Sequence, residues 1–316
     1  MNKKVSIIIP NYNRAHLISY TLNSILDQDY TNWECIIVDD SSTDNSLEII
    51  DSYLKRDTRF RLYNRPYDMP KGANSARNYG LKMSTGFYIQ WFDSDDIMTK
   101  NHLSALVSEI INSDADFAVG ISENFSEANN FNKKLYDFER DSSKINVNNY
   151  ARLQIEWITD DFLCKREILK GLKFNESFKT DGDEYNFFTQ LLFINSNGVF
   201  VNDVLTLRRI HKDTLSDISE MSELAINKKI AVIKYLTFSD IEKYNDSNLK
   251  RWFLSGYMQY SFKIALKNEY PPFYKMSIRK IAKHFSILQC LNFILAIYGG
   301  YYFGKGYKFL RASIQF

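Results

Sequence analysis

The sequence has few cysteines and only a short apolar run near its first residue. Its three cysteines, Cys35, Cys164 and Cys290, are far apart and in no metal-type pairing, so a reducing compartment is favoured. The apolar run that begins at Val5 lasts only five residues before Pro10, which is too short for the hydrophobic region of a secretory signal. We therefore expect a protein that stays in the cytoplasm.

Two glycine-rich phosphate-binding motifs are also missing. No Gly-x-Gly-x-x-Gly follows the first predicted strand, and no Gly-x-x-x-x-Gly-Lys-Ser/Thr occurs anywhere in the chain. These motifs cradle phosphates in dinucleotide oxidoreductases and in P-loop NTPases. Both classes of protein are therefore disfavoured.

Neither sign of charge is in excess. Forty Lys and Arg residues against thirty-eight Asp and Glu residues give a net charge of +2, which argues against a protein dedicated to binding nucleic acid. The charge is nevertheless uneven, because residues 270–316 include seven basic residues and no acidic one. This asymmetry indicates two parts of the chain with different partners.

The first hundred and twenty residues alternate between short apolar runs and amphipathic stretches. The chain has 316 residues, 45% hydrophobic and 25% charged, so it can form one large domain with an appendage or two small domains. The alternation is typical of βα units that build a largely parallel sheet. The predicted strands are 5–9, 34–39, 60–63, 87–92 and 117–121. The predicted helices are 15–26, 72–83 and 100–112, together with a helix that is capped by residues 42–44 and ends at residue 54.

The pattern changes after residue 121. The segment 122–149 is polar and rich in asparagine, so we expect a loop or an excursion on the acceptor side. Residues 183–194 are predicted to form a helix, and 199–201 and 204–210 to form paired strands. From about residue 219 onward the pattern is helical, and no internal repeat occurs. The predicted fold class is α/β with a helical C-terminal extension.

Carboxylates follow the predicted strands, where open parallel sheets bind their ligands. Asp40 follows the second strand, and 93–96 (Asp-Ser-Asp-Asp) follows the apolar strand that ends at Phe92. If that segment stays extended, Asp93 and Asp95 point the same way and offer paired oxygen ligands to Mg²⁺ or Mn²⁺, leaving sites open for a diphosphate. The alternative is a solvated turn or a helix cap, for Asp40 as well.

Four segments resemble the successive signatures of family 2 glycosyltransferases with the GT-A fold, of the bacterial, polysaccharide-biosynthesis type. They are 5–13, 37–44, 76–80 and 92–96, in the right order and at the right strand ends. The resemblance covers about the first two thirds of the chain. It implies a GT-A catalytic domain over 1–216, which is a Rossmann-like, mostly parallel sheet flanked by helices, and a helical region over 217–316.

The resemblance also implies a nucleotide site and a metal site. The segment with Pro10, Tyr12 and Asn13, together with Asp40, matches positions that hold uracil and ribose in the family. Lys71 and Arg77 fall in the loop and helix that face the diphosphate, although Arg77 can equally pair with a structural acid. Asp93 and Asp95 match the Asp-x-Asp motif, in which the first lies near the ribose and metal and the second binds Mn²⁺ or Mg²⁺.

Two later elements match less completely. The family's acidic motif, usually Glu-Asp before a helix, is matched by Asp183-Glu184 in reversed order. The position that the family uses as catalytic base is therefore Glu184, with one more methylene, and Asp183 stays open as the alternative. His211 resembles a histidine that completes the metal shell, although a lone His after a strand is more often structural.

The resemblance implies an inverting, metal-dependent transfer of a sugar from a nucleotide-sugar, expected to be a UDP-sugar, to a saccharide or lipid-linked saccharide. A metal and a cation would stabilise the departing diphosphate, and a carboxylate would take the proton of the acceptor hydroxyl. A sugar nucleotidyltransferase is one alternative, but 10–13 contains no glycine for a phosphate loop. A non-catalytic protein that binds a nucleotide-sugar is the other alternative, and such a protein would keep the fold without the catalytic base.

Residues 285–304 form a stretch of twenty residues without formal charge, near the length that spans a bilayer. Gln289, Asn292 and the pair at 299–300 (Gly-Gly) argue against a spanning helix. An ordinary helical subdomain is one interpretation. The absence of acids from 270–316 favours an interfacial segment on anionic lipid, with aromatic residues at headgroup depth. We expect a protein that is peripheral on the cytoplasmic face of the inner membrane.

Overall fold

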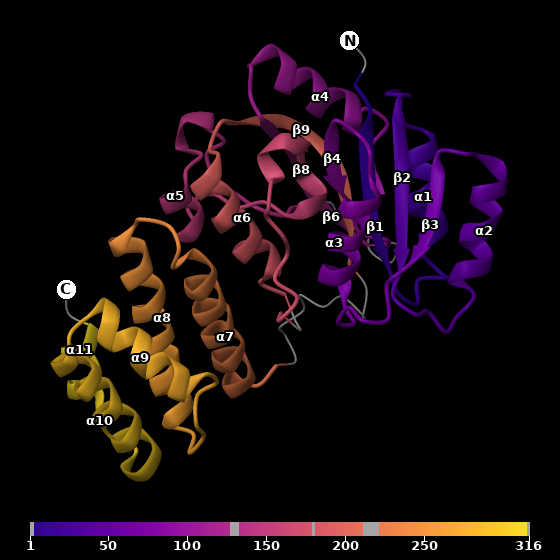
Figure 1. Cartoon of the computed structure of the whole chain (residues 1–316). Helices are drawn as coiled ribbons and strands as arrows, with labels where there is room; N and C mark the ends of the chain where they lie inside the picture. Colours follow the sequence, from indigo (N-terminus) through magenta and orange to yellow (C-terminus); the bar gives the residue numbers. More distant parts are fainter. Residues whose placement is uncertain (1–2, 127–132, 179–180, 211–220, 315–316) are drawn as a thin grey trace. The chain divides into compact units, whose positions relative to one another are not determined.

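The computed structural model describes residues 3–126, 133–178, 181–210 and 221–314 (Figure 1). The chain divides into two compact units. The first comprises Met1–Lys179 and Asp183–Thr214, and the second comprises Thr180–Gly182 and Leu215–Phe316.

The first unit begins with the predicted alternation of strands and helices, which is confirmed. Its first four strands pair in parallel in the order β3-β2-β1-β4. The strands are β1 (Val5–Asn11), β2 (Trp33–Asp39), β3 (Phe60–Asn64) and β4 (Tyr88–Trp91), and the helices are α1 (Ile18–Leu26), α2 (Ser46–Arg56), α3 (Ala73–Met83) and α4 (His102–Asn112). Every residue of β1 and β2 is buried, as expected for parallel strands covered on both faces.

Alternate residues of β1 enter different cores on the two faces of the sheet. Val5, Ile7 and Ile9 pack with residues of α1 and α4, whereas Ile8 packs with Trp91 and with aromatic residues of the later chain. Helix α3 lies against this second face at Gly80, where an added Cβ would stand 2.4 Å from Ile8 Cγ2. Glycine is therefore required for the close approach of α3 to the sheet.

The second half of the sheet is mixed rather than parallel. Strand β8 (Phe162–Lys165) runs antiparallel to both β4 and β6 (Phe117–Phe125), and β9 (Gly198–Arg209) runs parallel to β6. Short strand β5 (Ile97–Met98) pairs with β9, and β7 (Lys133–Lys134) pairs with β6. The full order is β3-β2-β1-β4-β8-β6-β9-β5. The predicted α/β class with flanking helices is confirmed.

Two local predictions are wrong. Residues 199–201 and 204–210 are not two paired strands, because β9 runs through both and absorbs the polar residues between them in irregularities of its register with β6. The segment 122–149 is not wholly a loop. Strand β6 continues to Phe125, and 3-10 helix η1 (Ser142–Lys144) and helix α5 (Val147–Ala151) follow.

An aromatic cluster holds helix α6 (Asp183–Ile194) on the sheet. Trp91 at the end of β4 contacts the rings of Phe174 and Phe187, each at 5.2 Å between centroids, and Phe174 stacks on Phe187 at 4.1 Å. Since Phe187 lies one turn beyond Asp183, this packing places the first turn of α6 beside the carboxyl end of β4.

The second unit is helical, as predicted. Its helices are α7 (Glu223–Ile241), α8 (Ser247–Ala265), α9 (Tyr274–His284), α10 (Ile287–Phe303) and α11 (Tyr307–Ile314), drawn in orange to yellow in Figure 1. The side chains of Ser222, Asp246 and Ser286 cap α7, α8 and α10 by accepting a backbone N–H of the first turn. Among the described helices, none combines the length and the hydropathy needed to cross a membrane.

Candidate active site

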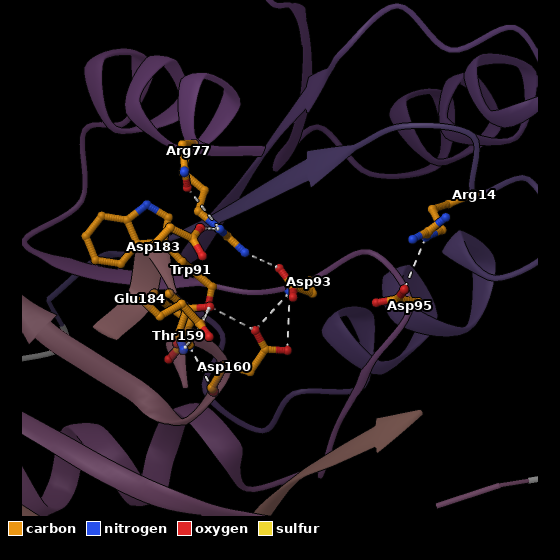
Figure 2. A network of polar contacts seen from close by, with 11 residues as sticks. Arg14, Arg77, Trp91, Asp93, Asp95, Thr159, Asp160, Asp183 and Glu184 are labelled. Atoms are coloured by element: carbon orange, nitrogen blue, oxygen red, sulfur yellow. Dashed lines mark hydrogen bonds and ion pairs between the residues drawn. The ribbon is translucent and has the colours of Figure 1, made fainter. Parts of the chain in front are cut away.

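Arg77 joins three separate parts of the chain at the carboxyl end of β4. Its guanidinium donates Nη2–H to Asp93 Oδ1 at 2.8 Å and Nη1–H to Asp183 Oδ2 at 2.9 Å (Figure 2). Burial lowers the pKa of Arg77, but the carboxylates of Asp93, Asp183 and Glu184 outweigh this effect and raise it. Arg77 thus remains a buried cation that fixes the position of two carboxylates of the predicted site.

Glu184 lies next to this network and is held by a different partner. Its Oε1 accepts hydrogen bonds from the backbone N–H and from the hydroxyl of Thr159, both at 2.6 Å (Figure 2). Burial raises the pKa of Glu184, Arg77 lowers it, and Asp183 and Asp93 raise it again, to about 7. A carboxylate with this pKa can accept a proton near neutral pH.

Thr159 and Asp160 are site residues that sequence reasoning missed. They belong to the 3-10 helix η2 (Thr159–Asp161), which the buried amide of Gln90 in β4 anchors by donating to the carbonyls of both residues. The Asp160 carboxylate accepts the backbone N–H of Asp93 at 3.1 Å. No motif marked this segment, because its role depends on contacts with residues far away in the sequence.

Asp160 and Asp96 form a buried carboxyl pair. Burial is the largest cause that raises the pKa of each group, and nearby carboxylates, including Asp93, raise both further. The two side chains share a hydrogen bond, and a hydrogen bond between two carboxyl groups requires a proton on one of them. The pair therefore carries less than two negative charges.

The expectation that Asp93 and Asp95 point the same way is wrong. Residues 94–95 form a turn instead of continuing the strand. Asp93 consequently faces Arg77, whereas Asp95 accepts Nε–H of Arg14 at 3.1 Å (Figure 2).

The donor chemistry of this edge nevertheless fits a divalent cation. Carboxylate oxygens are the ligands that Mg²⁺ and Mn²⁺ prefer, and the side chains of Asp93 and Asp95 are 41% and 18% exposed beside their arginine partners. Within the ranges that the structure describes, no three His, Cys, Asp or Glu side chains are arranged to hold a metal ion. His211 lies outside the described residues.

The loops after β1, β2 and β3 contain residues predicted to bind the nucleotide. Lys71 Nζ stands 3.8 Å from the ring centroid of Tyr12, and both side chains are exposed. Asp40 is buried and committed to the chain itself, because it binds the Arg65 guanidinium and accepts the backbone N–H of Gly72 at 2.8 Å. Tyr12 and Lys71 are therefore better placed than Asp40 to meet a ligand.

The same loops have unusual backbone conformations. Asn13 and Ser41 have φ of 51° and 66°, in the left-handed region that non-glycine residues rarely adopt. Asn13 is held by its N–H to Ser42 Oγ at 2.9 Å and by the Thr43 N–H, which it accepts at 2.8 Å. Such strain is often found at functional sites. Pro10 lies buried within β1, beneath these loops.

Comparison with curated proteins finds glycosyltransferases. The chain is 40% identical over 116 residues to the UDP-Glc:alpha-D-GlcNAc-diphosphoundecaprenol beta-1,3-glucosyltransferase WfgD of Escherichia coli, covering 37% of this chain and 44% of the relative. It is 22% identical over 307 residues to the GalNAc(5)-diNAcBac-PP-undecaprenol beta-1,3-glucosyltransferase of Campylobacter jejuni, covering 93% of each. The chain spans less than half the length of WfgD and of GlyG of Streptococcus pneumoniae.

Comparison with solved structures finds the same fold. TarS 1–349 of Staphylococcus aureus, in complex with UDP-GlcNAc, matches with a TM-score of 0.68 at 15% identity, covering 98% of this chain and 90% of that chain. The mannosyltransferase PcManGT of Pyrobaculum calidifontis, in complex with GDP-Man and Mn²⁺, matches with a TM-score of 0.53 at 15% identity, covering 96% and 88%. These likenesses confirm the predicted GT-A fold.

The model of the family described as glycosyl transferase family 2 matches residues 6–173, which include all of β1 but its first residue, β2 to β4, Arg77 and the turn with Asp93 and Asp95. This match covers more than half of the chain. The protein therefore belongs to glycosyl transferase family 2.

Proposed function

We propose that the chain is an inverting, metal-dependent glycosyltransferase that moves a sugar from a UDP-sugar to a hydroxyl of a saccharide or lipid-linked saccharide, with Glu184 as the base. The observation that carries this proposal is the state of Glu184. It is a carboxyl group with a pKa of about 7, oriented by two hydrogen bonds from Thr159, beside the paired Arg77 and Asp93. Such a group suits proton removal from an acceptor hydroxyl.

Glu184 is a better base than Asp183. The Asp183 carboxylate is buried in an ion pair with Arg77 at 2.9 Å, so protonating it would leave that cation with one partner fewer. Glu184 has no such cationic contact within hydrogen-bonding distance among the described residues. This difference supports Glu184, which stands at the position that the family uses as base, although the two acids occur in reversed order.

The proposed reaction is a single displacement. The acceptor oxygen bonds to the anomeric carbon while its proton passes to Glu184, and the bond from that carbon to the diphosphate breaks with its electron pair leaving on UDP. Because attack and departure take place on opposite faces, the anomeric configuration inverts. Arg77 acts by holding Asp93 and Asp183 in place, and Lys71 with Tyr12 supplies a cation and an aromatic surface at the donor side.

A divalent cation, Mn²⁺ or Mg²⁺, belongs to this proposal. Asp93 and Asp95 are the residues proposed to hold it, with His211 as a further ligand. When bound, the cation supplies positive charge for the diphosphate that departs. Support comes from the carboxylate chemistry of this edge and from the Mn²⁺ in the PcManGT complex.

The donor and acceptor classes rest on the relatives. TarS was solved with UDP-GlcNAc, and WfgD is named for UDP-Glc and for an acceptor on diphosphoundecaprenol. We propose a UDP-sugar donor and a lipid-linked saccharide acceptor on these grounds. The enzyme would work as a peripheral protein at the cytoplasmic face of the inner membrane, with residues 270–316 in contact with lipid. Residues 1–216 are the proposed catalytic domain.

Donor binding is tested by thermal unfolding and calorimetry with UDP and GDP, each with and without Mn²⁺. A ligand at a hundred times its Kd stabilises the folded state by about 2.7 kcal/mol. We expect metal-dependent stabilisation by UDP that is lost in Asp95→Asn and kept in Asp203→Asn, a control on an exposed residue of β9. Stabilisation by GDP alone would overturn the choice of donor, and no response to either nucleotide would overturn the donor site.

The base is tested by hydrolysis of UDP-glucose and UDP-GlcNAc, in which water replaces the acceptor. Glu184→Gln should abolish release of UDP while UDP still binds. Asp183→Asn should weaken UDP binding and lower the melting temperature, because it removes one partner of Arg77. If Glu184→Gln keeps full activity and Asp183→Asn, still folded, loses it, Asp183 is the base. Full activity in both variants would exclude both residues.

A further inference from the structure

Helix α10 is apolar on two faces, of which only one is buried. Residues Cys290, Phe293, Ala296, Ile297 and Gly300 are buried, and Gly300 lies close to Phe262 of α8. On the opposite side, five large residues are 46–70% exposed: Leu288, Leu291, Leu295, Tyr298 and Tyr302. Their spacing of three and four residues puts them on one face of the helix, which we name the α10 stripe. An apolar face of this length in contact with water indicates an interaction surface.

The end of the stripe is aromatic. The rings of Tyr298 and Tyr302 lie 4.6 Å apart, and Phe303, which is also exposed, contacts both. Tyr307 and Phe309 of α11 add two more exposed rings. Tyrosine has an apolar ring and a polar hydroxyl, so it is suited to the boundary between headgroups and acyl chains.

The second unit also presents cations that form no ion pair with an acid among the described residues. Five basic residues are exposed and, within the part of the chain that the structure describes, form no ion pair: Lys275, Arg279, Lys305, Lys308 and Arg311. Other cations of α9 differ, because Lys280 and Lys283 bind the carboxylate of Glu242, the residue that follows α7. The unpaired cations lie in α9, directly after α10 and in α11.

We propose that the α10 stripe lies flat on an anionic lipid bilayer, with its leucines among the acyl chains and the unpaired cations on the headgroups. This inference deepens the proposed function, on which it rests for the lipid-linked acceptor. Helix α10 has 17 residues, about 26 Å of length, and its other face is covered by packing with α8, α9 and α11. It therefore has one face to offer to lipid.

Charge decides between lipid and a second copy of the chain as the occupant. Residues 270–316 include seven basic residues and no acidic one, so pairing two stripes would bring like charges together. An anionic membrane surface attracts each nearby Lys or Arg by about 1 kcal/mol, which corresponds to about fivefold in affinity. The bilayer is thus complementary to this surface, whereas a second copy is not.

The inference is tested by sedimentation of the full chain with vesicles of phosphatidylcholine, with and without phosphatidylglycerol, in the absence of donor and acceptor. We expect strong binding to the vesicles with phosphatidylglycerol, weak binding to the neutral ones and a loss of binding at high salt. Equal binding to both kinds of vesicle, or binding to neither, would overturn the proposal.

Apolar variants test whether the stripe itself enters the lipid. The double variant Leu291→Gln, Leu295→Gln should lower binding more than about tenfold, because two leucines no longer leave water. The matched control is Ile111→Gln on α4, an apolar side chain that is 57% exposed in the first unit, and it should bind as the wild type does. An equal loss in the control and the double variant would refute a role of the stripe.

Charge variants test the contact with headgroups. Replacing Lys305, Lys308 and Arg311 with Gln should lower binding by about a hundredfold at low salt, whereas Lys170→Gln with Lys173→Gln should have no effect. Sedimentation equilibrium without lipid tests whether a second copy of the chain covers the α10 stripe instead. A dimer that dissociates in the leucine variants would overturn the lipid assignment. Melting temperature and UDP binding of each variant show that it is folded, and they separate failure of this inference from failure of the donor site.

Discussion

The hydrogen bond from the Thr159 hydroxyl to Glu184 leads to a prediction about the pH dependence of activity. That hydroxyl stands 2.6 Å from Glu184 Oε1 and favours the ionised carboxylate, so it lowers the pKa of Glu184. Thr159→Val removes the hydroxyl, keeps nearly the same volume and leaves the backbone N–H in place. We therefore expect the pKa of Glu184 to rise above its present value of about 7.

The size of this shift follows from the energy of the lost bond. A hydrogen bond to a charged group contributes about 1.5–3 kcal/mol, and about 1.36 kcal/mol corresponds to one pKa unit, so the shift should be about one to two units. At pH 7 the ionised fraction of Glu184 would fall from about a half to between about a tenth and a hundredth. Turnover by a base that must be ionised would fall by about five- to fiftyfold.

The assay is the pH profile of kcat/KM for UDP-sugar hydrolysis, which reports the pKa values of the free enzyme. The acid limb of the wild type should lie near pH 7 and move upward in Thr159→Val, with activity recovering at alkaline pH. Thr159→Ser keeps the hydroxyl and should keep the wild-type limb. An unmoved limb in Thr159→Val, or activity lost equally at every pH, would refute the reasoning.

Three further predictions concern stability. Arg77→Ala leaves the buried carboxylate of Asp183 and the partly exposed carboxylate of Asp93 without their cation and should cost about 3–5 kcal/mol in urea unfolding, whereas Lys55→Ala, in an exposed pair, should change nothing measurable. Gly80→Ala should destabilise by about 1–3 kcal/mol because its Cβ would stand 2.4 Å from a core methyl, whereas Gly256→Ala, which faces a flexible lysine chain, should be neutral or stabilising. The pKa of Asp160 is raised on folding, so the folded state holds more protons and stability falls as pH rises above the ordinary carboxyl range. Asp160→Asn should flatten that dependence, and an unchanged slope would contradict the shared proton.

The βα alternation and the sites at strand ends could be predicted from sequence because they depend on local patterns. The runs 5–9 and 34–39 are continuous and apolar, which buried parallel strands require, and the acidic segments follow such strands directly. Asp93 could be placed at the carboxyl end of β4 in this way, whereas the ion pair of Arg77 with Asp183 depends on the packing of Phe187 against Trp91. His211 lies outside the described residues, so its role stays a prediction.

Tertiary contacts decided what local patterns leave open. Asp93 and Asp95 face apart because the turn between them is anchored at Asp96 by Thr21 and by Arg209, 75 and 113 residues away. Thr159 reaches Glu184 only because η2 lies between β4 and α6 in space.

Helix α10 gives the same division between sequence and structure. Composition alone shows an uncharged segment flanked by cations. Which of its two apolar faces remains in water depends on how α8, α9 and α11 pack around it. The sequence by itself thus determined the order of the elements and the residue types at the site, because these depend on neighbours in the chain. Only the tertiary structure decided side-chain direction, protonation and exposure, because these depend on groups far apart in sequence.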